Sequence, residues 1–119
     1  MVSSKEEISY NILEKNLNEY EPITDERIKN FIIENKNLYP FLKEVYPIIK
    51  EFFPNDKLIL EYVEDYEYPD WITLFINIKE DKDESIAEER VKIHRKLFHE
   101  TIAIERKYNV ISLVNISLF

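Results

Sequence analysis

A strand–loop–strand pattern between residues 57 and 78 decides the fold class: KLILEYVE occupies 57–64, DYEYPD 65–70 and WITLFINI 71–78. Apolar side chains alternate with other residues along both outer stretches, which is typical of β-strands that bury one face. The alternating positions are Leu58, Leu60 and Tyr62 in the first stretch and Ile72, Leu74, Ile76 and Ile78 in the second. We therefore predict a β-hairpin with strands at 57–64 and 71–78, joined by an acidic loop.

A long amphipathic helix is expected after the hairpin. It should begin at Asp83, or at Ser85 with Glu88 three residues later as a capping box, and run to about Lys107. Its expected apolar stripe comprises Ile86, Val91, Ile93, Leu97, Phe98, Ile102, Ile104 and Tyr108. Asn109 is expected to take the left-handed position that glycine usually fills after a helix. A third strand at 110–118 then completes a β-β-α-β unit.

The order of these elements predicts an α+β fold with a three-stranded, mostly antiparallel sheet. The helical crossover makes the third strand run in the same direction as the second. A right-handed crossover would place it beside the first, in the order 2-1-3, with the long helix over the even-numbered strand positions. The other face carries Ile59, Val63, Phe75, Ile111, Leu113 and Phe119. These side chains need cover from the N-terminal helices or from a partner.

Three helices are predicted before the hairpin. The first covers residues 4–20 and ends before Pro22, because Ile8, Ile12, Leu13, Leu17 and Tyr20 recur at helical spacing. Thr24 resembles the N-cap of the second helix, with Ile23 and Ile28 as a hydrophobic staple. Asn35 and Asn37 follow this helix and are natural substitutes for glycine where the backbone needs a positive φ.

The third helix is expected to begin near Pro40 and to continue to Phe53. Its buried face should consist of Phe41, Leu42, Val45, Ile48, Ile49, Phe52 and Phe53. Pro47 lies inside this helix and cannot donate a hydrogen bond to the Lys43 carbonyl, so we expect a kink or a break there. The chain is thus expected to form a single domain over 1–119, with a helical part at 1–53 and a β-β-α-β part at 57–119.

The composition excludes several classes of site. The chain has 119 residues and contains neither glycine nor cysteine. Without glycine it cannot form a phosphate-binding P-loop, the dinucleotide fingerprint or the G-x-S-x-G nucleophile elbow. Without cysteine it has no disulfide, thiolate nucleophile or cysteine-ligated metal. No cofactor is predicted.

The charge balance disfavours contact with nucleic acid or with an anionic membrane. The formal net charge is −8 at pH 7, which repels both polyanions unless a local basic patch overcomes it. No apolar run reaches the about 18 residues of a membrane span, and the N-terminus lacks the apolar core of a signal peptide. A cytoplasmic location is therefore expected.

The hairpin loop supports two interpretations. Glu61, Glu64, Asp65, Glu67 and Asp70 could hold Mg²⁺ or Ca²⁺. Their spacing matches no calcium loop, the glycine of such a loop is missing, and a solvated hairpin tip that blunts a sheet edge is the favoured interpretation. The aromatic residues between the acids are typical anchors of protein interfaces, or else they pack in the core.

The long helix carries the second candidate surface. Lys92, Arg95, Lys96, His99 and Arg106 lie near one another on its surface and could meet RNA, DNA or an acidic partner. Complementarity to the helix dipole explains the same pattern. His94 and His99 are five residues apart and point in different directions, unlike a metal-binding pair, and His94 is expected to be structural.

From Leu38 onward the chain resembles a family of small, uncharacterised prokaryotic α+β proteins of unknown function. The matching segments are 47–53, 58–61, 67–70, 74–75, 83–88 and 114–118. The resemblance implies a shared fold and no activity, so no functional residue is carried over from it. Tyr68 extends the acid-proline-acid turn of that family by one residue.

These observations favour a non-enzymatic protein-interaction or regulatory module, with a protein partner or a second copy of the chain as its ligand. The candidate interaction surface comprises Tyr66, Tyr68, Trp71, Phe75, Lys92, Arg95 and Lys96. The alternative is a metal-dependent enzyme, or a protein acting on RNA or nucleotides, that uses the acidic hairpin.

Overall fold

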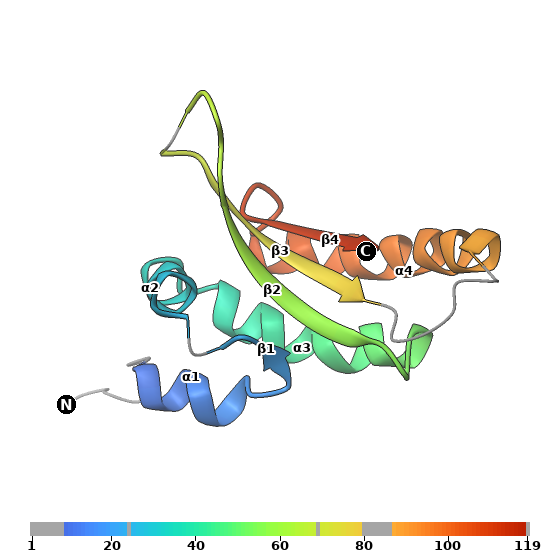
Figure 1. Ribbon diagram of the computed structural model, residues 1–119, viewed down its shortest axis with the longest axis horizontal. Helices are drawn as coiled ribbons and strands as arrows, with labels where there is room; N and C mark the ends of the chain where they lie inside the picture. Colours follow the sequence, from blue (N-terminus) through green and yellow to red (C-terminus); the bar gives the residue numbers. More distant parts are fainter. Residues whose placement is uncertain (1–8, 24, 69, 80–86, 119) are drawn as a thin grey trace.

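A computed structural model describes residues 9–23, 25–68, 70–79 and 87–118. Over these residues the chain forms four helices and a mixed four-stranded sheet (Figure 1). In chain order the elements are α1 (Tyr10–Asn16), β1 (Tyr20–Glu21), α2 (Glu26–Glu34), α3 (Leu38–Phe52), β2 (Lys57–Glu64), β3 (Ile72–Lys79), α4 (Ala87–Tyr108) and β4 (Val114–Leu118). The α+β class and the two hairpin strands are confirmed. The second of these strands covers 72–79, one residue later than the predicted 71–78.

The predicted three-stranded, mostly antiparallel sheet with the order 2-1-3 is wrong in strand number, in pairing and in order. The sheet has the order β1-β2-β3-β4, in which β2 and β3 are antiparallel while β1–β2 and β3–β4 are parallel pairs. The last strand does run in the direction of β3, as predicted, but it begins at Val114 and not at residue 110, and it lies beside β3 and not beside β2. The edge of β2 that the predicted order gives to the last strand pairs with β1 instead, where Tyr20 and Glu21 lie opposite Leu58 and Ile59.

Strand β1 is the element that the sequence pattern missed. The apolar spacing predicts Tyr20 in the first helix, yet α1 ends at Asn16 and Tyr20 is in the sheet. Its hydroxyl donates to the Leu42 carbonyl at 2.6 Å, and its ring meets Tyr46 edge to face at 5.5 Å. Burial raises the pKa of the Tyr20 hydroxyl well above its ordinary value. Tertiary contacts of one aromatic residue, and not a repeating pattern, therefore fix this strand.

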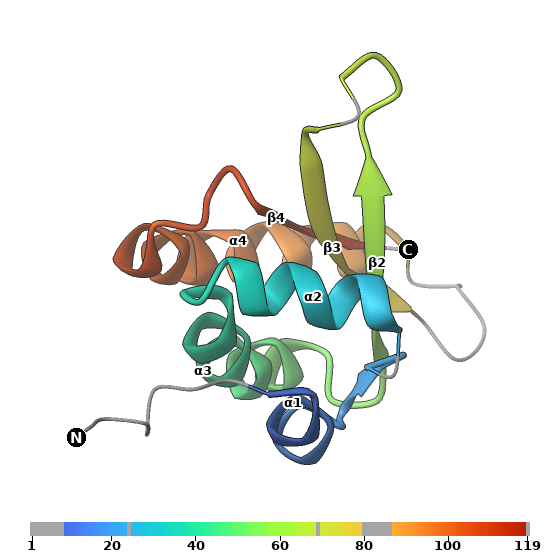
Figure 2. The same cartoon turned by 90° about the vertical axis from the view of Figure 1, so that its left-hand side faces the viewer.

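The described helices α2, α3 and α4 lie together on one side of the sheet (Figure 2). The even-numbered positions Leu58, Leu60, Leu74, Ile76 and Ile78 are buried against them in one hydrophobic cluster, which also contains Leu97 and Ile104 of α4. The prediction that the long helix covers this face is thus confirmed. The N-terminal helices share the same face and do not cover the opposite one.

The opposite face of the sheet carries a polar row between half-buried apolar residues. The Asn77 side-chain amide in β3 donates from Nδ2 to a Glu61 carboxylate oxygen in β2 at 3.0 Å, and the Ser117 hydroxyl in β4 donates to Asn77 Oδ1 at 2.6 Å. Ile59 and Phe75 on this face are half-buried. The row links three strands across a face that no described helix covers.

Several predicted helix ends are corrected. The N-cap of α2 is Asp25, whose side chain accepts from the Arg27 amide at 2.8 Å, and not Thr24, which lies outside the described residues. Asn35 and Asn37 have negative φ, so neither replaces a glycine. Asn35 donates its side-chain amide to the Phe31 carbonyl, and Asn37 donates to Tyr108 at the end of α4. The side-chain hydrogen bonds of Asn35 and Asn37, and not a left-handed backbone conformation, therefore account for asparagine at these two positions.

Helix α3 is continuous through Pro47 and is not broken there. Phe41, Leu42, Val45 and Ile49 are fully buried along its length, as predicted. Burial on both sides of the proline compensates for the backbone hydrogen bond that Pro47 cannot make.

Helix α4 ends as predicted, since Asn109 has a φ of 58°. Its predicted start at Asp83 or Ser85 lies outside the described residues. Leu97 and Ile104 are buried, but Val91 and Phe98 are 48% and 50% exposed. The predicted apolar stripe is therefore too wide, because α4 contacts the rest of the molecule along a narrower face. None of the described helices is long and apolar enough to cross a membrane.

Candidate functional site

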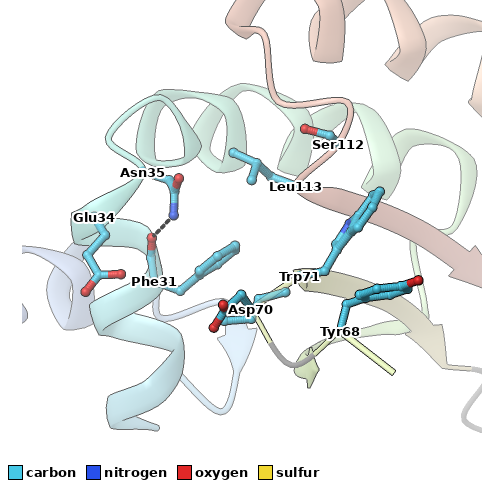
Figure 3. A pocket seen from close by; sticks show the side chains of 9 residues that line it. Phe31, Glu34, Asn35, Tyr68, Asp70, Trp71, Ser112 and Leu113 are labelled. Atoms are coloured by element: carbon cyan, nitrogen blue, oxygen red, sulfur yellow. Dashed lines mark hydrogen bonds between the residues drawn. The ribbon is translucent and has the colours of Figure 1, made fainter. Parts of the chain in front are cut away.

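A cavity of about 690 Å³ lies beneath the β2–β3 hairpin (Figure 3). Three segments form its walls: the end of α2, the hairpin, and the loop between α4 and β4. The lining residues, which we call the hairpin groove, are Phe31, Glu34, Asn35, Tyr68, Asp70, Trp71, Ile72, Ser112 and Leu113. Cavities of this size are in the range that holds small ligands or a few side chains.

The hairpin tip is folded so that Tyr68 and Trp71 are held at the groove. A carboxylate oxygen of Asp65 accepts hydrogen bonds from the amides of Glu67 and Tyr68 at 2.8 and 2.9 Å. The Asp65 amide donates to the Trp71 carbonyl at 2.9 Å, and the Trp71 amide donates to the Tyr68 carbonyl at 2.8 Å. Asp65 therefore acts as a turn-forming residue, a role in which aspartate commonly bonds the backbone two and three residues on.

The other two walls are fixed by the core. The Phe31 side chain is 7% exposed and meets the Tyr62 ring edge to face at 6.0 Å. The α4–β4 loop is tied to the sheet because the Leu74 amide donates to the Leu113 carbonyl at 2.8 Å. These walls are therefore preformed. Figure 3 shows the Phe31 ring directed toward the side of the cavity where Trp71 lies, with Glu34 at the outer edge beyond Phe31.

The groove combines apolar walls with negative charge. Among the described residues that line it, Glu34 and Asp70 are the charged ones, and both are exposed carboxylates. Tyr68 and Trp71 remain 64% and 60% exposed, although Phe31 beside them is buried. The groove thus offers two aromatic rings and two acids to a ligand.

The seven residues of the predicted interaction surface do not form one patch. Tyr68 and Trp71 lie together in the groove, whereas Tyr66 is 98% exposed at the hairpin tip and does not line it. Phe75 is half-buried on the sheet face opposite the helices. Lys92, Arg95 and Lys96 are exposed on α4. The structure therefore brings together two of the seven, and the function of all seven stays a prediction.

The groove also contains residues that sequence reasoning missed. Phe31, Glu34 and Asn35 belong to α2, and Ser112 and Leu113 to the loop after α4. No spacing in the sequence relates these segments to residues 68–72, because only the packing of α2 and β4 on the sheet brings them together. The closely spaced aromatic residues of the hairpin are the one local feature of the sequence that indicates the groove.

The acidic residues of the hairpin do not converge on a metal position. Asp65 is engaged in the turn, and Glu61 is hydrogen-bonded to Asn77 in the polar row of the sheet. In the part of the chain that the structure describes, no three acidic or histidine side chains are grouped as metal ligands would be. The solvated-tip interpretation of this loop agrees with these contacts.

The two histidines have separate surroundings. His94 lies 3.2 Å from the Ile116 carbonyl oxygen through Nε2, which must be the donor because a carbonyl only accepts. His99 is exposed on α4 and its ring meets Phe98 edge to face at 6.3 Å. His94 thus connects α4 to β4, which agrees with a structural role.

Comparisons with protein-family models, with curated proteins and with solved structures found no match. The resemblance of residues 38 onward to a family of uncharacterised proteins therefore stays a prediction.

Proposed function

We propose that this protein is a non-enzymatic interaction module that binds a segment of a partner protein in the hairpin groove. The observation that carries the proposal is the position of Tyr68 and Trp71. Both rings are more than half exposed and both line the same cavity. Tyrosine and tryptophan are the residues most enriched at energetically dominant interface positions, because they bring large contact area at a small entropic cost.

The surroundings of these rings support the proposal. Hydrogen bonds of Asp65 order the hairpin tip, and Phe31 and Leu113 provide apolar surface on the facing walls. A binding surface that is ordered before the ligand arrives loses less entropy on binding. The hairpin groove therefore has the preformed walls and apolar contact area that a peptide-binding site needs.

The alternative, a metal-dependent enzyme or an RNA-acting protein, receives no specific support from the contacts of the acidic loop. Calorimetric titration with Mg²⁺, Mn²⁺ and Ca²⁺ discriminates between the two proposals. Binding of one of these ions that is lost in Glu61→Gln/Asp65→Asn would favour the enzyme.

A peptide-display selection against the whole protein tests the interaction module. Selected peptides are expected to lose at least tenfold in affinity for Trp71→Ala and for Tyr68→Ala. Tyr66→Ala is the matched control, since this aromatic residue is on the same hairpin but outside the groove, and it should bind as the parent protein does. Peptides that bind Trp71→Ala and the parent protein equally well would contradict the proposal.

The partner in the proposal is another protein or a second copy of the same chain. Light scattering over a range of concentrations separates these two. A dimer that dissociates on Trp71→Ala would place a second copy in the groove, whereas a monomer leaves a different protein as the ligand.

A further inference from the structure

One arrangement of side chains recurs in this fold: a basic group lies over an aromatic ring and pairs with a carboxylate. Arg27 is 5.1 Å from the Tyr62 ring and 3.4 Å from Asp25. Arg90 is 5.1 Å from the Phe53 ring and 2.6 Å from Asp56. The combination is favourable because the ring face and the carboxylate both attract the cation.

The arrangement is repeated with lysine. Lys29 is 4.5 Å from the Tyr10 ring and pairs with Glu14, and it is itself buried. Lys107 is 5.1 Å from the Tyr108 ring and 3.0 Å from Glu44. In these four cases a lysine or arginine of the same chain contacts both an aromatic ring and a carboxylate.

The hairpin groove holds the aromatic and acidic parts of this arrangement. Tyr68 and Trp71 supply the rings, while Asp70 and Glu34 supply the carboxylates, and no lysine or arginine is among the described residues that line the cavity. The third component of the arrangement, a cationic group, would therefore come from the ligand.

We infer that the occupant of the hairpin groove is a segment of a partner protein that carries an arginine or lysine flanked by apolar residues. This inference rests on the proposed function and names its ligand class. The basic group lies over Trp71 or Tyr68 and pairs with Asp70 or Glu34. The apolar neighbours pack against Phe31 and Leu113. Arginine fits best because its planar guanidinium both stacks on a ring and binds a carboxylate through two parallel hydrogen bonds.

Two further observations favour a segment of protein over a small free cation. The cavity of about 690 Å³ is larger than one guanidinium group requires. Its apolar walls also come from separate elements, so full coverage needs apolar atoms on both sides of the charge.

The net charge of −8 attracts a basic segment from a distance and raises its association rate.

Calorimetry with two peptides tests the inference on the whole protein. The first probe is acetyl-Leu-Arg-Leu-Arg-Leu-amide, and the second has citrulline in place of both arginines, which preserves the shape and removes the charge. The arginine peptide is expected to bind at least fivefold more tightly at low salt, and the difference should shrink as salt is added. Equal affinities, or no binding of either peptide, would overturn the inference.

Variants of the groove acids locate the effect. Glu34→Gln/Asp70→Asn should lose most of the preference for arginine over citrulline. Glu51→Gln/Glu100→Gln removes the same charge from exposed positions outside the groove and should keep the preference. If both double variants lose it equally, the attraction comes from the net charge and the inference fails.

A third titrant distinguishes the source of the cation. Spermidine that binds as tightly as the arginine peptide would indicate a small-cation site and overturn the proposed segment. If the display selection instead yields neutral apolar peptides that depend on Trp71, the proposed interaction module stands and only the basic ligand is wrong.

Discussion

The chain leaves α4 through a residue with left-handed backbone geometry, Asn109, whose φ is 58°. Asparagine tolerates this region better than other residues with a Cβ atom, and this chain contains no glycine to take the position. The Val110 amide then donates to the Glu105 carbonyl at 3.0 Å, which closes the helix. This single conformation directs the chain towards the loop that forms one wall of the hairpin groove.

Asn109→Ala should destabilise the protein by about 1 kcal/mol, because alanine pays the steric cost of the left-handed region. Asn109→Gly should be neutral or stabilising, since glycine adopts positive φ without that cost. Urea unfolding followed by circular dichroism measures both. A loss of the same size in both variants would show that the side chain of Asn109, and not its backbone angle, is what matters.

Glu105 is a buried acid on α4, with only 6% of its surface exposed. Burial raises the pKa of its carboxyl above the ordinary value of 4.5. The folded protein therefore binds this proton more tightly than the unfolded chain does. The free energy of unfolding consequently falls as the pH rises from the unfolded pKa through the folded one.

Glu105→Gln should accordingly be more stable than the parent protein at pH 7, and the advantage should disappear below pH 4, where the carboxyl is neutral in both states. Thermal unfolding at the two pH values measures this. Glu100→Gln, an exposed position on the same helix, is the control and should show no such dependence. Destabilisation of Glu105→Gln at pH 7 would mean that the charged form makes a favourable contact.

At the scale of elements, a buried ion pair connects the turn before β2 to α4. Arg90 Nη2 is 2.6 Å from an Asp56 carboxylate oxygen, and the two side chains are 10% and 8% exposed. The Asp56 carbonyl also accepts from Lys50 Nζ at 2.6 Å. Because removing one partner of such a pair leaves the other charge buried, Asp56 and Arg90 should be strongly coupled.

Asp56→Ala should cost roughly 3 kcal/mol of unfolding free energy, the usual loss when a buried pair is broken. Asp56→Ala/Arg90→Met should cost less than Asp56→Ala alone, since the buried guanidinium is removed as well. Urea denaturation of Asp56→Ala, Arg90→Met and the double variant gives the double-mutant cycle, from which the coupling energy of the two residues is obtained. Strictly additive losses would show that the two residues do not depend on each other.

The elements that sequence reasoning predicted correctly are those with a long, regular pattern. The strands at 57–64 and 72–79 have alternating apolar positions, and α3 has a continuous apolar face. Strand β1 has only two residues, so no periodicity could reveal it. Asp25 and Thr24 are both good N-caps by residue type, and residue identity alone did not separate them.

At the scale of the whole molecule, neither the strand order nor the groove follows from local patterns. The direction of β4 was fixed by the helical crossover, but its neighbour depended on β1 pairing with β2. The groove joins residues near 31–35, 68–72 and 112–113, which share no motif. Only the hairpin contribution, Tyr68 and Trp71, could be proposed from residue chemistry, because aromatic side chains in an acidic loop are unusual for a purely solvated tip.

Ligand binding at the hairpin groove can be measured directly, because one residue of the groove is a fluorescent reporter. Trp71 is the only tryptophan in the sequence, and it is 60% exposed at the wall of the groove. A peptide obtained by display selection can therefore be titrated while the emission of this one residue is recorded. We predict that binding shifts the emission to shorter wavelength and reduces its quenching by acrylamide, since the ligand covers the indole ring. A peptide that binds by calorimetry but leaves both the emission and the quenching of Trp71 unchanged would contradict the proposed site.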